Sequence, residues 1–216
     1  MLKCLLIAIE GIDGVGKSTQ CHRLSDWLTR RQVKNIQVKE PGATAFGSKL
    51  RELLVSRTAG ELSALTEMLL FEADRSHSYE TLILPALRDG TTVIKDRSIF
   101  GTLAYQGYAG GVPLDLIRTI TRHASAGRQA DWSFVLDLPI NEAESRLRER
   151  GGEVVADPFE AASPAHKEKV RQGYLSEARA NKGWCSIIDA TLGIDDIASL
   201  ICERVEQLLE NRADES

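Results

Sequence analysis

A glycine-rich segment near the start of the chain constrains its fold more than any other feature. Residues 11–18 read Gly-Ile-Asp-Gly-Val-Gly-Lys-Ser, which fits the pattern G-x-x-x-x-G-K-S, and they stand between an apolar run and a helical pattern. In this setting the glycines let backbone N–H groups surround phosphate oxygens, and the N-terminus of the following helix adds its dipole. The segment therefore predicts a nucleoside triphosphate site, in which Lys17 reaches the β and γ phosphates and Ser18 coordinates Mg²⁺.

Apolar runs alternate with helical patterns along the chain, which predicts an α/β fold with a parallel sheet wrapped by helices. The predicted strands are Cys4–Ile9, Ile36–Val38, Thr92–Ile94, Trp132–Leu138 and Cys185–Ile188. The predicted helices are Ser18–Arg31, Ser63–Leu87 with a bend at Ser76–Ser78, Leu114–His123, Asn141–Arg150, Pro164–Ala180 and Ile194–Leu209. We expect a single domain over residues 1–210, with a mobile lid at about 150–163 and a polar tail over 211–216.

Composition and charge exclude several classes of protein. With 216 residues, of which 43% are hydrophobic and 27% charged, the chain is neither disordered nor fibrous. Its net charge of −4 gives no general attraction to nucleic acid or anionic lipid, and no apolar run approaches the roughly 20 residues of a membrane span. The four cysteines are dispersed and no signal peptide is evident, so we expect a cytoplasmic protein without nucleic-acid or membrane partners.

A second element of the site is a short apolar strand that ends in Asp96-Arg97. The carboxyl ends of parallel strands face the ligand crevice, so Asp96 is placed to organise the water shell of Mg²⁺ and Arg97 to neutralise a phosphate. A GTPase is disfavoured, because residues 181–184, the string nearest to N-K-x-D, lack the aspartate. The pattern favours a small-molecule kinase whose acceptor phosphate has its own cations, for which the candidates are Lys39, Arg51, Arg75 and Arg97.

Strings over almost the whole chain resemble the thymidylate kinase family, whose members phosphorylate dTMP with ATP and Mg²⁺. They occur in the family's order and spacing: Glu10–Gln20, Glu40–Gly42, Arg51–Leu54, Leu69–Arg75, Asp96-Arg97, Leu103–Tyr108 and Ile188–Ala190. The resemblance implies a P-loop NTPase-type fold with a five-stranded parallel sheet in the order 2-3-1-4-5. It also implies a homodimer, for which the predicted helices at 63–87 and 114–123 are candidate faces.

The resemblance implies a binding site for the nucleoside part of dTMP. Phe71 is expected to stack on the thymine ring, and Arg75 and Gln106 are expected to hydrogen-bond the edge of the base. Thr102 is expected near the base, and Tyr105 against C2′ of the sugar, where it favours deoxyribose.

Other roles implied by the resemblance concern the phosphates. Asp13 is expected at the sugar 3′-hydroxyl or the metal shell, and Lys39, Arg51 and Arg97 at the acceptor phosphate. The residues expected to bind ATP lie in and beside the glycine-rich segment, together with one arginine farther along the chain: Gly11, Asp13, Gly14, Gly16, Lys17, Ser18, Thr19 and Arg148.

Family members take one further catalytic arginine from the phosphate-binding loop or from the lid. Gly14 stands where the first type has that arginine, so the resemblance implies the lid type, with Arg148 and Arg150 as candidates. Arginines two residues apart point to different faces of a helix. We therefore expect Arg150 to act in catalysis, with Lys17, Asp96 and Arg97, and Arg148 to flank the adenine.

Three positions depart from the family's pattern and leave alternatives open. Ser98 follows Asp96-Arg97 where an aromatic residue is usual, and Asp-Arg-Ser resembles deoxynucleoside kinases, so a deoxynucleoside kinase or another nucleoside monophosphate kinase is one alternative. Lys39 replaces an arginine, and Pro158 stands where the lid arginine is expected. These two departures favour the other alternative, a module that binds nucleotides without turnover.

Overall fold

The computed structural model describes residues 4–55, 62–149 and 162–214, which form a five-stranded parallel sheet with helices on both faces. The strand order β2-β3-β1-β4-β5 confirms the predicted order. The strands are β1 (Leu6–Glu10), β2 (Asn35–Lys39), β3 (Thr92–Asp96), β4 (Trp132–Asp137) and β5 (Cys185–Asp189). β1 is the central strand and pairs with β3 and β4, so the segment that follows it leaves from the middle of the sheet.

The helices follow most of the predicted ranges. They are α1 (Lys17–Arg30), α2 (Ala45–Val55), α3 (Ala64–Ser78), η2 (Tyr79–Ile83), α4 (Leu84–Arg88), α5 (Ile99–Thr102), η3 (Leu103–Ala109), α6 (Leu114–Ala124), α7 (Ile140–Glu149), α8 (Pro164–Ala180) and α9 (Ile194–Asp214). Ser63 and Ser163 cap α3 and α8, because each hydroxyl accepts a hydrogen bond from a backbone N–H three residues on. η2 and η3 are wider, π-type turns that continue α3 and α5.

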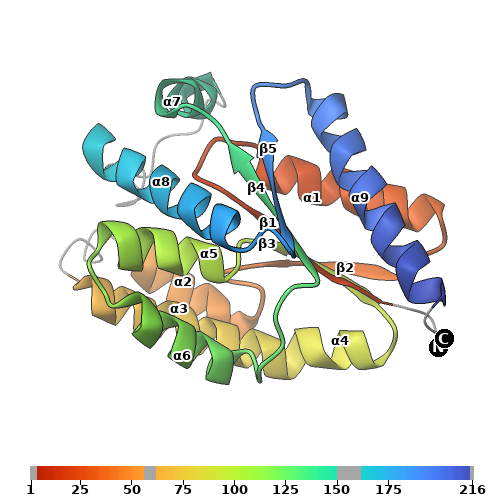
Figure 1. Cartoon of the computed structure of the whole chain (residues 1–216). Coiled ribbons are helices and arrows are strands. Elements are labelled where there is room, and N and C mark those ends of the chain that lie inside the picture. The colour runs from red at the N-terminus through yellow and green to blue at the C-terminus, as the bar shows by residue number, and fades with distance from the viewer. Residues whose placement is uncertain (1–3, 56–61, 150–161, 215–216) are drawn as a thin grey trace.

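The three inner strands, β1, β3 and β4, are buried along almost their whole length, so both faces of the middle of the sheet are covered. Ile7 and Ile9 of β1 belong to a core cluster with Leu24 of α1, whereas the alternate residues Leu6 and Ala8 belong to a second cluster around η2. Figure 1 shows α1 and α9 together on one side of the sheet, and α3, α4 and α6 on the other. Within the described residues, no helix combines the length and the hydropathy needed to cross a membrane.

The structure differs from the sequence-based expectation in several helices. Helices α2, α5 and η3 were not predicted; Gly47 weakens the helical pattern of α2, and η3 has a π-type period. The predicted helix 63–87 is α3, η2 and α4 in succession. Its irregularity is the wider π-helical turn that starts at Tyr79 rather than a bend at Ser76–Ser78. Helix α9 extends to Asp214, so most of the predicted polar tail is helical.

Helix α8 lies close against η3, and a glycine allows this approach. A Cβ atom added to Gly173 would lie 3.0 Å from the Cα atom of Ala104 and 3.0 Å from the Cβ atom of Tyr108. Both neighbouring atoms belong to the backbone or are attached directly to it, so they cannot rotate away. The position of η3, and of the side chains that it carries, therefore depends on a small residue at position 173.

We expect Gly173→Ala to destabilise the fold. Overpacking costs about 1–3 kcal/mol, which exceeds the helix propensity of about 1 kcal/mol that alanine gains over glycine. Urea denaturation should therefore show a net loss of about 1 kcal/mol in the free energy of unfolding. Gly183→Ala is the control, because a Cβ atom there would meet no atom within 4 Å. Equal stabilities of the two variants would contradict the close contact.

Candidate active site

The glycine-rich segment forms a tight loop between β1 and α1, and its shape requires glycine. Gly11, Gly14 and Gly16 have φ of 134°, 85° and 97°, in the region that side chains rarely adopt. A Cβ atom at Gly11 would lie 2.6 Å from the carbonyl oxygen of Leu136, and one at Gly14 would lie 2.4 Å from that of Ala143. The loop is therefore wedged between β4 and α7, and no arginine fits at Gly14.

Lys17 begins α1 and folds back over this loop. Its buried ammonium donates to the carbonyl oxygen of Ile12 at 2.7 Å and lies 3.5 Å from the Asp13 carboxylate. Burial, together with the positive charge of Arg97, lowers the pKa of Lys17 to about 8, although the nearby carboxylates oppose this shift. The ammonium is thus held at the phosphate loop without a strong ion pair, which leaves it free to bind a phosphate oxygen.

Ser18 and Asp96 meet beside the loop and fit a magnesium ion. The Ser18 hydroxyl donates to Oδ2 of Asp96 at 2.6 Å, while Oδ1 of Asp96 is buried and has no hydrogen-bond partner among the described residues. Mg²⁺ is commonly held by one or two protein oxygens and completes its shell with water and phosphate, which this pair allows. No group of three or more metal-binding His, Cys, Asp or Glu side chains occurs in the described parts of the chain. Thr19, next in α1, is half-buried.

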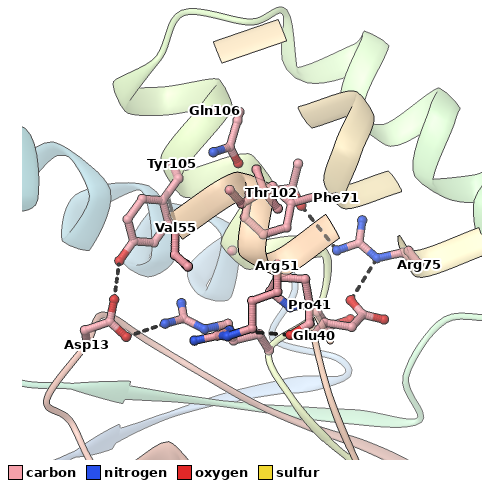
Figure 2. Close-up of a pocket in the computed structure, with 14 residues that line it drawn as sticks. Asp13, Glu40, Pro41, Arg51, Val55, Phe71, Arg75, Thr102, Tyr105 and Gln106 are labelled. Atoms are coloured by element: carbon pink, nitrogen blue, oxygen red, sulfur yellow. Dashed lines mark hydrogen bonds and ion pairs between the residues drawn. The ribbon is translucent and has the colours of Figure 1, made fainter. Parts of the chain in front are cut away.

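Asp13 connects the phosphate loop to a neighbouring pocket. Its carboxylate pairs with Arg97 and accepts a hydrogen bond from the Tyr105 hydroxyl at 3.4 Å (Figure 2). Burial opposes ionisation of Asp13, but Arg97 and Lys17 outweigh it and hold the pKa of this carboxyl below its usual range. Arg97 has φ of 78°, a strained conformation for a residue with a side chain, which the surrounding structure must hold.

The pocket encloses about 590 Å³ between α2, α3, α5 and η3, and part of this space is open to solvent. Every residue that the resemblance assigns to dTMP lines it, with the exception of Lys39, which is exposed at the end of β2. The lining residues are Asp13, Glu40, Pro41, Arg51, Leu54, Val55, Phe71, Arg75, Arg97, Ser98, Gly101, Thr102, Tyr105 and Gln106. Aromatic, polar and cationic groups from four separate parts of the chain thus meet around one cavity.

A buried network of charges holds Arg75, and sequence reasoning missed most of it. Arg75 pairs with Glu72, with Oε2 of Glu40 at 3.1 Å, and donates to the Thr102 hydroxyl at 3.2 Å. Lys95, which is completely buried, pairs with the other oxygen of Glu40 at 2.6 Å. Burial alone would raise the pKa of Glu40, but Lys95 and Arg75 lower it. Lys95, a lysine inside an otherwise apolar strand, is the signal in the sequence that could have indicated this network.

The other wall of the pocket is polar as well. The Gln106 side-chain amide donates to Glu67 at 3.0 Å, so η3 is tied to α3 next to the cavity. Arg51 of α2 donates to the carbonyl oxygen of Pro41 at 3.4 Å, and Figure 2 shows it at the same end of the pocket as Asp13. Arg51 and Arg97 therefore lie near the phosphate loop, while Phe71, Arg75, Thr102 and Gln106 lie farther from it.

Part of the expected lid on the donor side lies outside the described residues. This part is residues 150–161, which include Arg150 and Pro158. Arg148 is exposed near the end of α7. Arg146 on the same helix donates to the carbonyl oxygen of Ala190 at 2.9 Å, which ties α7 to the turn after β5.

Because burial lowers the pKa of Lys17 to about 8, we expect ATP affinity to depend on pH above neutrality. The ammonium is charged well below pH 8 and neutral well above it, and only the charged form attracts phosphate. Calorimetry should show ATP affinity falling by up to about tenfold per pH unit above pH 8. Lys17→Met should bind weakly and without this dependence. A wild-type affinity that stays constant from pH 7.5 to 9.5 would contradict the assignment.

Comparisons with known proteins agree with this geometry. A family model described as thymidylate kinase matches residues 9–201. The chain is 36% identical over 208 residues to the thymidylate kinase of Desulfosudis oleivorans, covering 94% of this chain and 97% of the relative. It is 37% identical over 209 residues to that of Caulobacter vibrioides, covering 97% and 99%. A crystal structure of thymidylate kinase from Ehrlichia chaffeensis has a TM-score of 0.74 at 28% identity, covering 94% of this chain and 99% of that chain. On these matches and on the shared five-stranded fold, the chain belongs to the thymidylate kinase family.

Proposed function

We propose that the protein transfers the γ-phosphoryl group of ATP to the phosphate of dTMP and so forms dTDP. The observation that carries this proposal is the Asp13 junction, where the phosphate loop meets a pocket lined by an aromatic ring, polar groups and arginines. Membership of the thymidylate kinase family supports the choice of substrate.

The pocket's two ends suit the two ends of dTMP. The thymine ring would stack on Phe71, with Arg75, Thr102 and Gln106 at its polar edge. Arg75 is held by two glutamates and oriented toward Thr102, so its guanidinium is a preorganised donor. The Tyr105 ring lies between the base end and Asp13, where it would crowd a 2′-hydroxyl. The acceptor phosphate would lie near Arg51 and Arg97, at the Asp13 end, and Lys39 has no role in this arrangement.

The chemistry proposed for this site needs no general base. An oxygen of the dTMP phosphate is already ionised near neutral pH and attacks the γ-phosphorus in line; the bond from the γ-phosphorus to the bridging oxygen breaks, and ADP leaves with that electron pair. Lys17 and Arg97 would neutralise the transferring group, with Arg150 as the proposed third cation. Mg²⁺, held by Ser18 and through water by Asp96, would supply additional neutralisation of the phosphates. Arg148 is proposed beside the adenine.

The phosphate end of the pocket favours a phosphate acceptor over an unphosphorylated nucleoside. A nucleoside kinase needs a carboxylate base beside the sugar hydroxyl. Asp13 is the carboxylate at the phosphate-loop end of the pocket, but it pairs with Arg97, which lowers its pKa, so it is a poor base. Ser98, which suggested that alternative, lines the pocket and accepts a weak hydrogen bond from Lys95 at 3.5 Å.

Cys21, Cys185 and Cys202 are free thiols, which is compatible with the reducing cytoplasm, and we propose the cytoplasm as the location of the protein.

Product analysis tests the function directly. The protein is incubated with ATP and Mg²⁺ and with dTMP, dUMP, dCMP, UMP or thymidine in separate reactions, and we expect dTDP as the preferred product. Phe71→Ala should raise KM for dTMP by roughly 5- to 150-fold, the equivalent of about 1–3 kcal/mol of stacking, and leave KM for ATP nearly unchanged. Formation of dTMP from thymidine would instead identify a nucleoside kinase, and dTMP binding without product would identify a catalytically inactive module.

We further propose that the protein is a homodimer. Large apolar side chains are exposed on α2, α3 and α6. Helix α3 contacts both α2 and α6 (Figure 1). The exposed side chains are Phe46, Leu53, Leu65, Leu69 and Leu116. Exposed apolar side chains on three neighbouring helices are suited to burial against a second copy.

Light scattering after size exclusion should give twice the chain mass of 23.8 kDa. We expect Leu69→Glu to shift the protein toward monomer, because it places a charge in the centre of the proposed interface. Leu200→Glu on α9 is the control, since Leu200 is equally exposed but lies on the other side of the sheet. A wild-type protein that runs as a monomer would refute the proposal.

A further inference from the structure

Glu10 is a buried carboxylate at the point where β1 enters the phosphate loop. It is the last residue of β1, directly before Gly11, and is completely buried. Oε1 accepts a hydrogen bond from the backbone N–H of Phe100 at 3.2 Å, while Oε2 has no partner among the described residues. Glu10 does not line the dTMP pocket. Because burying a carboxylate is costly, its position at the end of an apolar strand calls for a compensating role.

The N–H group that donates to Glu10 belongs to the first turn of α5. This helix has no side-chain cap of its own, since the side chain of Ser98 at its N-cap accepts no hydrogen bond from the helix backbone. The Glu10 carboxylate, which comes from a distant part of the sequence, takes this place. A negative charge at the N-terminus of a helix is also favoured by the helix dipole.

The helical segment whose first turn donates to Glu10 carries part of the dTMP pocket. Helix α5 continues without a break into η3, and together they supply Thr102, Tyr105 and Gln106 to the lining. The first turn of this segment is therefore anchored to the same strand that leads into the phosphate loop. The Glu10 side chain therefore links the donor site to the acceptor site, in addition to the contacts of Asp13.

Helix α8 also packs against the start of α5. A Cβ atom at Gly101 would lie 3.2 Å from the Tyr174 hydroxyl oxygen and 3.9 Å from Oε2 of Glu10. Tyr174 is 1% exposed, and its hydroxyl has no hydrogen-bond partner among the described residues. A side chain at position 101 would therefore meet both Tyr174 and Glu10, so the start of α5 has little room for a residue larger than glycine.

The surroundings of Glu10 make the ionised form of its carboxyl group unfavourable. Burial raises the pKa of Glu10 to about 7, and cations on neighbouring elements offset only part of this effect. The charged and titratable groups coupled to it come from β3 and the turn after it, and from α1, α3, α8 and β5: Lys95, Arg97, Lys17, Cys21, Arg75, Tyr174 and Cys185.

We propose that Glu10 is a positioning residue for the acceptor nucleotide: by holding the first turn of α5 against the end of β1, it sets the place of Thr102, Tyr105 and Gln106 relative to the phosphate loop. This proposal rests on the proposed function, in which those residues hold dTMP. Glu10 contacts neither substrate. Its loss lets the α5–η3 segment shift, and a shift of about 1 Å between reacting groups is enough to cost roughly 100-fold in rate.

The test compares two carboxylates that bond the backbone at opposite ends of β1. Glu10→Leu removes the acceptor and keeps an apolar volume, whereas Glu10→Gln keeps a carbonyl oxygen for the N–H of Phe100. Asp131→Leu and Asp131→Asn are the matched controls, because Asp131 accepts from the backbone N–H of Leu6 at 2.7 Å, far from the pocket. For each variant we would measure melting temperature, kcat, KM for both substrates and, by calorimetry, dTMP affinity.

We expect Glu10→Leu to raise KM for dTMP by roughly 10- to 100-fold and to lower kcat, with KM for ATP changed by less than about threefold. Glu10→Gln should restore dTMP binding to within about threefold of wild type. Asp131→Leu should lower the melting temperature without moving KM for dTMP. A merely structural role of Glu10 would make Glu10→Leu resemble Asp131→Leu, and that result would overturn the proposal, as would a Glu10→Gln variant no better than Glu10→Leu.

A second set of variants keeps the test decisive if Glu10→Leu does not fold. Gly101→Ala adds a methyl group that meets the Tyr174 hydroxyl and displaces α5 without changing residue 10, so it should weaken dTMP binding by roughly tenfold or more. Tyr174→Phe removes the hydroxyl that the new methyl group meets and should restore binding in the double variant. Unchanged dTMP affinity in Gly101→Ala would count against a fixed place for α5.

Failure of the proposed function is visible separately, because it is read from the wild-type protein. If wild type forms no dTDP, that function fails, while dTMP affinity by calorimetry still compares the Glu10 and Asp131 variants. If wild type forms dTDP and Glu10→Leu keeps a normal KM for dTMP, only the positioning role fails.

Discussion

The carboxylate of Asp13 is the interaction on which the geometry of the site depends. It lies inside the phosphate loop, yet it binds Arg97 and Tyr105, which belong to the turn after β3 and to η3. In a direct transfer the two substrates must come within bonding distance of each other. A side chain that contacts both binding sites fixes the distance between the sites better than two sites without a shared contact would. The strained backbone of Arg97 is consistent with a position held for this contact.

A second constraint is the set of buried charges behind the pocket. Glu40 is neutralised by Arg75 on one oxygen and Lys95 on the other, and Arg75 also pairs with Glu72. Buried ion pairs add little net stability, because desolvation consumes most of their attraction. Their effect here is geometric, since Arg75 can satisfy two carboxylates and Thr102 in one orientation only. The Arg75 guanidinium therefore faces the cavity in a fixed orientation, so ligand binding loses little conformational entropy in ordering it.

Much of the fold and of the site was predictable from short-range patterns. The apolar strands and the amphipathic helices α1, α6 and α8 follow from periodicity, and the phosphate loop follows from a motif with a physical mechanism. Phe71, Arg75, Tyr105 and Gln106 came from resemblance, and the structure brings them to one pocket. Lys39 was expected there on the same grounds, but it ends an outer strand with its side chain exposed. Position in a motif does not show where a side chain points.

The sequence by itself determined the α/β class and the position of the phosphate loop, because both depend on the order of residues within a few turns or strands. Only the tertiary structure decided that Glu10, Glu40 and Lys95 support the pocket. A charged residue beside a strand end has no visible partner in the sequence, since its partner is tens of residues away. Burial makes that partner obligatory, and the packing of sheet, α3 and α5 selects which residue it is.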